Sequence, residues 1–571
     1  MSISRTTAAV RKRPGKVSTV LGAILWLGAA AASAQTARNP CAYQEIDSNK
    51  YGHQELQNPP NITPQHGSLH TTLAAQFTDP KTTSIAGCPV TLRTYNGQLV
   101  GPTLRVKPGD VMNILLDNRL PKETPDEIEQ QFQQEATNAH LDTRPASFNT
   151  TNLHTHGLHV SPTGNSDNVL LAIAPGSKFP YEIKVPRTHP TGSFWYHAHT
   201  HGSTSIQVGS GMAGALIIDD DESKLPLALR EANKHEKVMV FQTILYNTQG
   251  RLNDITALFP SPSNPTQCDQ PGNQGTWNCS KRRITINGQI VPRIKMRPGE
   301  VQRWRLIDTA FRESISVALE GHDLHEIALD GLYLGRIDTW PTGTAIELEP
   351  GYRSDVLVKA SMKPGVYRLL DQATPAAKAL RAVAEPENLL AEVMVEGEPL
   401  DMPLPTAAEM AALAPFPGVD LSQTANGVQQ VVFKLGQDVP GKKNYFQVNY
   451  RAFSPQHVRQ VQLGATDLWS VTTVGDPSGV PNGIPPTPHV FHIHVNPFQY
   501  TRSGPDGKPE TVWKDTLLIL AGQTSNLYTQ YQDYIGKFVM HCHILDHEDL
   551  GMMEVVEVVD ESSGVAAGHQ H

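Results

Sequence analysis

Residues 536–552 read GKFVMHCHILDHEDLGM, and residues 192–199 read GSFWYHAH. Both stretches fit the pattern Gly-x-Phe-x-x-His-x-His, although one lies in the last third of the chain and the other in the first. A repeat of this kind indicates two copies of one structural unit. Cys542 stands in the later copy where Ala198 stands in the earlier one, so only the later copy carries a thiol between its two histidines.

A second repeat links the first third of the chain to the middle. Residues 96–98 (NGQ) precede 107–110 (KPGD) and an alternating apolar run, and residues 287–289 (NGQ) precede 297–300 (RPGE) and another such run. Turn residues between alternating runs are typical of strands joined by tight turns. The two repeats predict three β domains, with boundaries in Pro-rich and charged stretches. The predicted domains are 35–225, 226–400 and 401–571.

The composition agrees with a turn-rich β protein. The 571 residues include 44 Gly and 44 Pro and only 18% are charged, which disfavours both a long-helix protein and a disordered chain. The 47 Lys and Arg are outnumbered by 56 Asp and Glu, so the net charge of −9 provides no chain-wide basic surface for nucleic acid. Histidine stands out at 23 residues, of which 12 lie in or beside four short clusters.

Residues 1–34 have the features of a secretory signal peptide. They carry five basic residues and no acidic one, then an apolar stretch from Val17 and the small-x-small sequence Ala32-Ser33-Ala34. We predict cleavage after Ala34 and export to the periplasm or the exterior, with no membrane association of the mature chain. The alternative is an uncleaved anchor, although the stretch is barely long enough to span a bilayer.

The five cysteines suit an oxidising compartment. Cys542 lies within a histidine cluster, and the other four lie outside the clusters. We predict one bridge between Cys268 and Cys279, which bracket a Gly/Pro/Asn loop, and one between Cys41 and Cys88 near the mature N-terminus. The other two ways of pairing these four cysteines stay open at this point.

Four histidine clusters indicate metal coordination. They are His154-x-His156, His197-x-His199, His489-x-x-His492-x-His494, and His541-x-His543 followed by His547 and Met552. All four are compatible with β-strands, on which residues two apart face the same side, so each His-x-His pair presents two imidazoles to one place. Cys542 then faces away from its two flanking histidines. The odd spacing of His489 from the next two histidines turns it to that same side.

The side-chain directions of Cys542 and His489 predict a second metal site. His489, Cys542, His547 and Met552 form the two-histidine, thiolate and thioether set of a blue-copper electron-transfer centre. Cys542 would link the two sites covalently and carry electrons between them, and the earlier copy would lack this site because it has Thr151 and Ala198 at the matching positions. Zinc is the alternative metal, but structural zinc favours closed Cys/His sets, whereas ten histidines with one cysteine and a thioether favour copper.

The four motifs resemble those of the multicopper oxidases, in particular the three-domain bacterial laccase-like enzymes, over nearly the whole mature chain. The resemblance implies an all-β fold of three cupredoxin-like Greek-key β-barrels, four copper ions per chain and no copper ligand in the middle domain. It implies type 1 copper at His489, Cys542, His547 and Met552, type 2 copper at His154 and His492, and the type 3 pair at His156, His197, His199, His494, His541 and His543.

The same resemblance implies the reaction. A small reducing molecule gives up electrons one at a time at type 1 copper, and dioxygen is reduced to water by four electrons at the other coppers. Asp167 and Glu548 match acids found at these places in the family, and we predict that they relay protons. The alternatives are an Asx turn at Asp167 and a solvated loop contact at Glu548.

Two other functions stay open. Metal-oxidising relatives resemble each other in a Met-rich insertion near the blue copper, which suits copper(I), whereas the 12 methionines here are scattered. We therefore predict oxidation of phenols and aromatic amines, with a cuprous or other metal-ion oxidase in copper tolerance as the alternative. A copper-free cupredoxin scaffold is a further alternative, but it would be expected to have lost ligands, and all ten histidines and Cys542 are present.

Three further segments give local predictions. The polar segment 125–140 has the composition of a surface helix. Residues 209–214 (GSGMAG) match a dinucleotide-binding fingerprint only formally, because the strand-like 215–218 follows them, and they predict a turn. His159 and His201 lie beside the clusters but outside the ligand spacing, so we expect them to orient neighbours or to face solvent.

Overall fold

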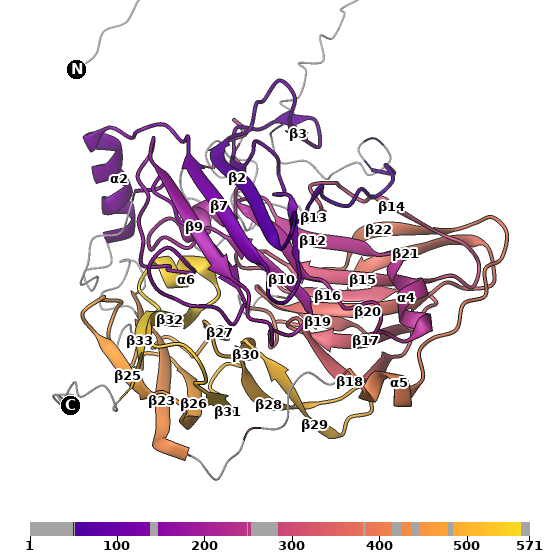
Figure 1. Ribbon diagram of the computed structural model, residues 1–571. Coiled ribbons are helices and arrows are strands. Elements are labelled where there is room, and N and C mark those ends of the chain that lie inside the picture. The colour runs from indigo at the N-terminus through magenta and orange to yellow at the C-terminus, as the bar shows by residue number, and fades with distance from the viewer. Residues whose placement is uncertain are drawn as a thin grey trace, which may run out of the picture. The chain divides into compact units, whose positions relative to one another are not determined.

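The structure is a computed structural model of the whole chain (Figure 1). It describes residues 41, 50, 52–136, 147–247, 249–252, 284–380, 384–413, 419, 424–436, 445–477 and 483–560, all within one compact unit, Pro40–His571. The predicted signal peptide and the predicted Cys268–Cys279 bridge lie outside the described residues. None of the helices in the described ranges combines the length and the apolarity needed to cross a membrane.

The first third of the chain forms two packed sheets, which we call the N-terminal sandwich. One sheet has the order β5 (Arg93–Tyr95), β2 (Ser68–Phe77), β7 (Val111–Asn118), β9 (Lys178–Lys184). The other has the order β1 (Asn61–Ile62), β6 (Thr103–Val106), β11 (Ala213–Ile218), β10 (Gly192–His197), β8 (His154–His156). Leu73 and Ile114 of the first sheet share one buried core with Phe194 of the second. The hairpin β3 (Ser84–Ile85) and β4 (Cys88–Pro89) stands apart from both.

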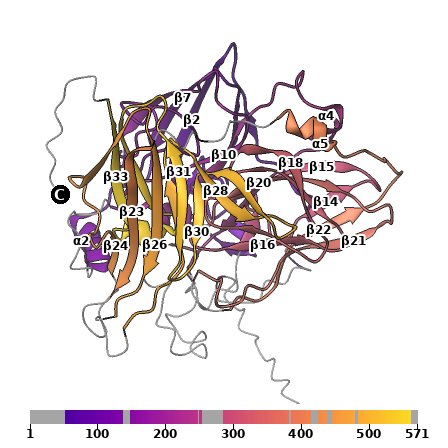
Figure 2. The same ribbon diagram turned by 90° about the horizontal axis from the view of Figure 1, so that it is seen from below.

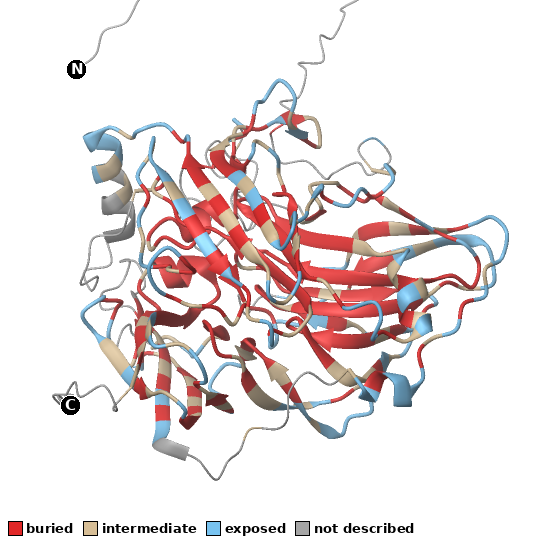
Figure 3. Cartoon of the chain, in the orientation of Figure 1, coloured by how far each residue is buried: buried red, intermediate tan, exposed pale blue. Residues whose placement is uncertain are grey.

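The middle sandwich repeats this arrangement. Its first sheet has the order β13 (Ile284–Ile286), β12 (Lys237–Thr243), β15 (Val301–Asp308), β20 (Arg353–Lys359), β17 (Leu324–Leu329), β18 (Leu332–Trp340). Its second has the order β14 (Arg293–Met296), β22 (Asn388–Val395), β21 (Gly365–Asp371), β16 (Ile315–Leu319), β19 (Ile346–Leu348). Trp304 and Val356 pack against Val317 and Leu369 in its core, and Figure 3 shows the central strands β15 and β20 in red, as buried over nearly their whole length.

The C-terminal sandwich is the third copy. Its first sheet has the order β24 (Tyr445–Val448), β23 (Thr424–Gly436), β26 (Thr466–Val474), β31 (Thr524–Gln530), β28 (Phe498–Ser503), β29 (Pro509–Lys514). Its second has the order β25 (Val458–Gln462), β33 (Met553–Val559), β32 (Gly536–Cys542), β27 (His489–Ile493), β30 (Thr516–Ile519). Figure 2 shows strands of the two sheets standing side by side in orange and yellow.

Corresponding strands pair in the same way in all three sandwiches. The parallel pairs β2–β7, β12–β15 and β23–β26 occupy the same place in the three first sheets, and β6–β11, β14–β22 and β25–β33 do so in the three second sheets. The predicted all-β class and threefold repetition are therefore confirmed. The proposed domain boundaries at 225/226 and 400/401 fall between the last strand of one sandwich and the first of the next, and stay predictions.

The repeated NGQ sequences form the same turn. Asn96 and Asn287 have φ of 56° and 55° and the following glycines 75° and 74°, a left-handed conformation that asparagine and glycine tolerate. Each asparagine also fastens its turn to the neighbouring strand, because its side-chain oxygen accepts the N–H of Ala74 or Val240. A third copy, which the sequence pattern does not reveal, occurs at Asn449, whose side chain accepts the N–H of Val432.

Five short helices complete the described chain: α2 (Pro125–Ala136), α3 (Thr204–Val208), α4 (Leu227–Asn233), α5 (Ala407–Ala411) and α6 (Leu545–Asp549). The predicted helix in 125–140 is confirmed as far as Ala136, and the predicted turn at 209–214 is confirmed for 209–211, because strand β11 begins at Ala213. The Cys41–Cys88 disulfide is also confirmed.

Candidate metal centres

Eight histidines gather where the N-terminal and C-terminal sandwiches meet, and we call them the eight-histidine cluster. They are His154, His156, His197, His199, His492, His494, His541 and His543, and none is more than 2% exposed. The cluster draws on the equivalent strands β8 and β10 of one sandwich and β27 and β32 of the other, with His199, His494 and His543 just beyond strand ends. The rings of His154 and His494 stack 3.9 Å apart, and so do those of His156 and His492.

Several ring nitrogens in this cluster have no hydrogen-bond partner within the described residues. They are Nε2 of His154, His197 and His492, Nδ1 of His156, and both nitrogens of His543. A buried polar atom without a partner carries a free-energy penalty of about 1–3 kcal/mol, which metal coordination would remove. Three histidine triads also have ligand atoms within 4.8 Å of one another, namely His154/His156/His197, His154/His492/His494 and His199/His494/His541. The residues present therefore fit metal ions.

The opposite ring nitrogens are held by hydrogen bonds. The Nδ1–H groups of His197 and His541 each donate to the next carbonyl, and that of His492 donates to the carbonyl of Asp515 at 2.8 Å. Such bonds fix the tautomer and leave Nε2 without a proton, as a metal ligand requires. His156 is reversed, because its Nε2 lies 3.2 Å from Oδ1 of Asp515 and its Nδ1 has no partner among the described residues.

Burial, and in most of these residues the neighbouring imidazoles, lower the pKa of the histidines in the cluster. The pKa of His199 falls to about 3 and that of His492 to about 4. The rings are therefore neutral at pH 7. Neutral imidazole is the form that binds copper or zinc.

A second set, which we call the cysteine site, lies on the other side of strand β32. Sγ of Cys542 is 3.5 Å from Nδ1 of His489 and 3.9 Å from Nδ1 of His547, and these two nitrogens are 3.2 Å apart. The N–H of Cys542 donates to the carbonyl of Met552, which is fully buried in the same core. Burial raises the pKa of the Cys542 thiol to about 12, so a metal ion is needed to hold it as a thiolate.

The two sites share a strand as the residue spacing predicts. His541 and His543 join the eight-histidine cluster while Cys542 between them faces the cysteine site with His489. One expectation was wrong, since His547 lies on the short helix α6 and not on a strand. In the N-terminal sandwich Thr151 stands at the position that corresponds to His489. Its hydroxyl donates a hydrogen bond to the side chain of Gln207 at 2.7 Å.

The two predicted acids lie beside the cluster. Asp167 is 3% exposed, and its carboxylate oxygens are 3.0 and 3.1 Å from Nδ1 of His154 and accept the N–H of Thr155. Burial raises its pKa to about 7. Glu548 is fully buried, and its Oε1 lies 3.6 Å from Nδ1 of His199. The alternative interpretation of Glu548 as a solvated loop acid is therefore wrong.

Two further histidines and one ion pair lie near the two sites. The ring of His159 donates to the carbonyl of Val495 and contacts Asp533, so it lies outside both ligand sets. His201 is partly buried, its ring lies 4.7 Å from that of Phe453, and it belongs to none of the ligand groups found in the described chain. Asp515 and Arg353, which hold His156, were not singled out in the sequence, because neither belongs to a recognisable local motif.

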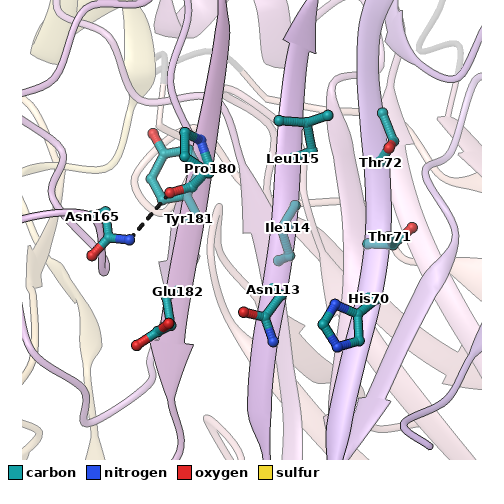
Figure 4. Close-up of a pocket in the computed structure, with 10 residues that line it drawn as sticks. All are labelled: His70, Thr71, Thr72, Asn113, Ile114, Leu115, Asn165, Pro180, Tyr181 and Glu182. Carbon is teal, nitrogen blue, oxygen red and sulfur yellow. Dashed lines mark hydrogen bonds between the residues drawn. The ribbon is translucent and has the colours of Figure 1, made fainter.

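A separate pocket of about 580 Å³ lies on the outer sheet of the N-terminal sandwich. His70, Asn113 and Glu182 stand side by side there on strands β2, β7 and β9 (Figure 4). None of the candidate metal groups in the described ranges lies in this pocket. The candidate metal ligands of the described chain therefore gather in the two histidine sites and not in this pocket.

Known proteins share this architecture. Three domain families, each described as multicopper oxidase, match residues 133–223, 228–386 and 427–562. The chain belongs to the multicopper oxidases. It is a copper-dependent oxidoreductase that uses dioxygen, and the predicted family, fold and enzyme class are confirmed.

Similar multicopper oxidases come from several bacteria. "Multicopper oxidase mco" of Staphylococcus haemolyticus is 24% identical over 82% of this chain and 83% of its own length, and a laccase of Bacillus subtilis is 26% identical over 83% and 91%. A solved multicopper oxidase of Campylobacter jejuni, described as a metallo-oxidase, has a TM-score of 0.67 with 21% identity and covers 90% of this chain and 98% of its own. The cell division protein FtsP of Proteus mirabilis is also similar, at 26% identity over 81% of this chain and 84% of its own length.

Proposed function

We propose that this multicopper oxidase is laccase-like and takes electrons singly from phenols or aromatic amines to reduce dioxygen to water. The observation that carries the proposal is the His541-Cys542-His543 segment, in which adjacent residues face two separate, fully buried ligand sets. Copper bound in these sets would supply the electron acceptor and the centre where dioxygen is reduced. Cys542 would provide the covalent electron path between them.

The proposed ligand sets combine the ligand groups of the structure with the copper assignment that the family resemblance implies. His489, Cys542 and His547 would hold type 1 copper, and the thioether of Met552, which is buried in the same core, would be a further and weaker ligand. His154 and His492 would hold type 2 copper, and the other six histidines of the cluster the type 3 pair, which makes four copper ions per chain. Unpartnered ring nitrogens directed into the cluster support this assignment.

Protons have to reach the same buried region. Asp167 and Glu548 are the two acids predicted to deliver them, and each lies beside a cluster histidine, His154 or His199. Oε2 of Glu548 has no hydrogen-bond partner among the described residues. That oxygen is therefore available to hold a proton and pass it on.

One ion pair and one aromatic ring border the cysteine site. Arg312 of the middle sandwich pairs with Asp546 at 2.7 Å, and its charge contributes to the lowered pKa of His489 and His547. The two charges of this pair largely cancel, and the pairing leaves the Asp546 carboxylate unavailable as a separate ligand for a metal cation. The aromatic ring of Phe446 stacks on His547 with centroids 4.5 Å apart.

Dioxygen uptake by the copper-loaded protein tests this proposal, with a phenol, an aromatic amine and copper(I) as donors. We expect the largest kcat/KM for a phenol or an aromatic amine. A larger value for copper(I) than for every organic donor would instead support a metal-ion oxidase, the second candidate, which is favoured by the similarity to the Campylobacter jejuni metallo-oxidase. A protein without blue colour and without dioxygen uptake would support the third alternative, a copper-free cupredoxin scaffold.

We also propose that the chain is exported, which the signal-like residues 1–34 and the Cys41–Cys88 disulfide support. Fractionation of producing cells tests this. Enzyme that stays in the cytoplasm at full length would contradict it.

A further inference from the structure

One arginine of the middle sandwich reaches into the surroundings of the eight-histidine cluster. Arg353 begins strand β20, is fully buried, and makes hydrogen bonds to all three sandwiches. Nη1 and Nη2 donate to the two carboxylate oxygens of Asp515, at 2.8 and 2.5 Å. The remaining N–H groups donate to the carbonyls of Ser193, Asp330 and Gly351.

Asp515, which lies between strands β29 and β30, in turn holds two cluster histidines. Its Oδ1 lies 3.2 Å from Nε2 of His156, and its backbone carbonyl accepts the Nδ1–H of His492 at 2.8 Å. The Thr516 hydroxyl donates to Oδ1 of Asp515 at 2.7 Å and lies 3.2 Å from the same His156 nitrogen. One carboxylate thus connects the arginine fork to the ring of His156.

This contact sets which nitrogen of His156 faces the cluster. A neutral imidazole has one N–H and one free lone pair, and a carboxylate can only accept, so Nε2 carries the proton and Nδ1 is free. His197, His492 and His541 have the opposite arrangement, with Nδ1 donating to a backbone carbonyl. Removing the carboxylate would let His156 take either tautomer.

Two glycines leave room for the Arg353–Asp515 ion pair and for the ring of His156. Gly157 has φ of +88°, and a Cβ there would lie 2.3 Å from Nη2 of Arg353 and 2.6 Å from Oδ2 of Asp515. Gly351 has φ of +93°, and its Cβ would lie 3.1 Å from the ring of His156. A side chain at 157 would therefore collide with the ion pair and one at 351 would crowd the ring, and the positive φ at both positions favours glycine.

We propose that Arg353 and Asp515 are positioning residues that hold His156 with Nδ1 directed at type 3 copper. The middle sandwich, which supplies no proposed copper ligand, thereby sets the geometry of the dioxygen-reducing site. This inference rests on the proposed copper assignment. Partners that orient a metal-binding histidine affect metal affinity by about 10–100-fold in other proteins.

The test compares Asp515→Asn with a matched control, Asp355→Asn. Asp355 is equally buried and is paired with Arg303 and Arg305, and it accepts the hydroxyl of Ser193 in the N-terminal sandwich, but it contacts none of the cluster histidines. Asparagine at 515 has one acceptor oxygen, so it cannot accept both the Nη2–H of Arg353, which now lies on Oδ2, and the Nε2–H of His156, which now lies on Oδ1. The readouts are copper retained against a chelator, the EPR spectrum of the oxidised protein, and the blue absorbance.

We expect Asp515→Asn to keep the blue absorbance but to lose copper at about 10–100-fold lower chelator concentration, or to show an extra EPR signal. The extra signal would arise because a coupled copper pair is EPR-silent and an uncoupled ion is not. Asp355→Asn should keep wild-type copper retention and EPR even if it lowers the unfolding temperature. Wild-type behaviour of Asp515→Asn in both measurements would overturn the proposal.

A double variant covers the case in which Asp515→Asn does not fold. Arg353→Met with Asp515→Leu removes both buried charges together, which is far less costly than leaving one charge unpaired. It also leaves Nε2 of His156 without its carboxylate, so the same copper loss and EPR signal are expected, and their absence overturns the proposal. If the wild-type protein itself binds no blue copper, the proposed function fails and not this inference.

Discussion

Glu349 in the middle sandwich links burial to pH-dependent stability. It follows strand β19, is 4% exposed, and accepts a hydrogen bond from the Ser314 hydroxyl. Burial raises the pKa of this carboxyl from 4.5 to about 8. The folded protein therefore keeps a proton that the unfolded chain loses between pH 4.5 and 8, and stability falls as the pH rises through that window.

The magnitude follows from the size of that shift. About 3.5 pKa units at 1.36 kcal/mol per unit give about 5 kcal/mol of stability lost by pH 9. Glu349→Gln keeps the shape and an acceptor for Ser314 but cannot ionise. We expect the variant to match the wild type near pH 4 and to be more stable by up to about 5 kcal/mol at pH 9.

Thermal unfolding of both proteins at pH 4, 7 and 9 measures this difference. For a folding unit of about 150–250 residues, 1 kcal/mol corresponds to about 2–4 °C, so the midpoints should differ by about 10 °C or more at pH 9. Glu347→Gln is the matched control, because Glu347 lies two residues earlier and is exposed. A midpoint difference that is the same at pH 4 and pH 9 would refute the reasoning.

Three other substitutions test the metal sites and the disulfide. Cys542→Ser should remove the blue absorbance and leave about three coppers bound, because the eight-histidine cluster is untouched; fewer than about three by metal analysis would contradict the two-site assignment. Glu548→Gln should leave the reduction of type 1 copper by substrate near the wild-type rate and slow its reoxidation by dioxygen. Stopped-flow absorbance follows both steps. Unchanged reoxidation at every pH would show that Glu548 does not deliver protons. Cys41→Ser with Cys88→Ser removes a disulfide between residues 47 positions apart and should lower the free energy of unfolding by up to about 4 kcal/mol. Denaturant titration measures this, and a change near zero would contradict it.

The repeated architecture was predictable only where turn chemistry left a trace in the sequence. The turns at Asn96 and Asn287 are followed by glycine, which suits positive φ and makes the motif recognisable. The third turn has Tyr450 at that position with φ of 65°, so the pattern was lost although Asn449 makes the same side-chain hydrogen bond. Hydrogen bonding at the asparagine, and not the glycine, is what the three copies share.

The histidine clusters were predictable because their spacing matches the two-residue period of a strand. Contacts that position the ligands were not, since they join single residues far apart in the chain. Asp515 is 359 positions from His156, and Arg353 is 162 positions from Asp515. Helix α6 was missed as well, because a five-residue helix is too short to show a helical period.

Helix α6 connects both candidate metal sites to all three sandwiches. The N–H of Leu545 donates to the carbonyl of Phe311, and Asp546 pairs with Arg312, so the helix is fixed to the middle sandwich. At its other end Asp549 accepts the N–H and the hydroxyl of Ser205 in the N-terminal sandwich.

The two residues between these anchors belong to different sites, His547 to the cysteine site and Glu548 to the surroundings of His199. A substitution that moves α6 should therefore disturb both sites at once. Cys542→Ser changes neither anchor, because Cys542 lies on strand β32 before the helix begins. Loss of the blue colour in that variant with the remaining coppers retained would thus report on the thiolate alone, and not on a displaced helix.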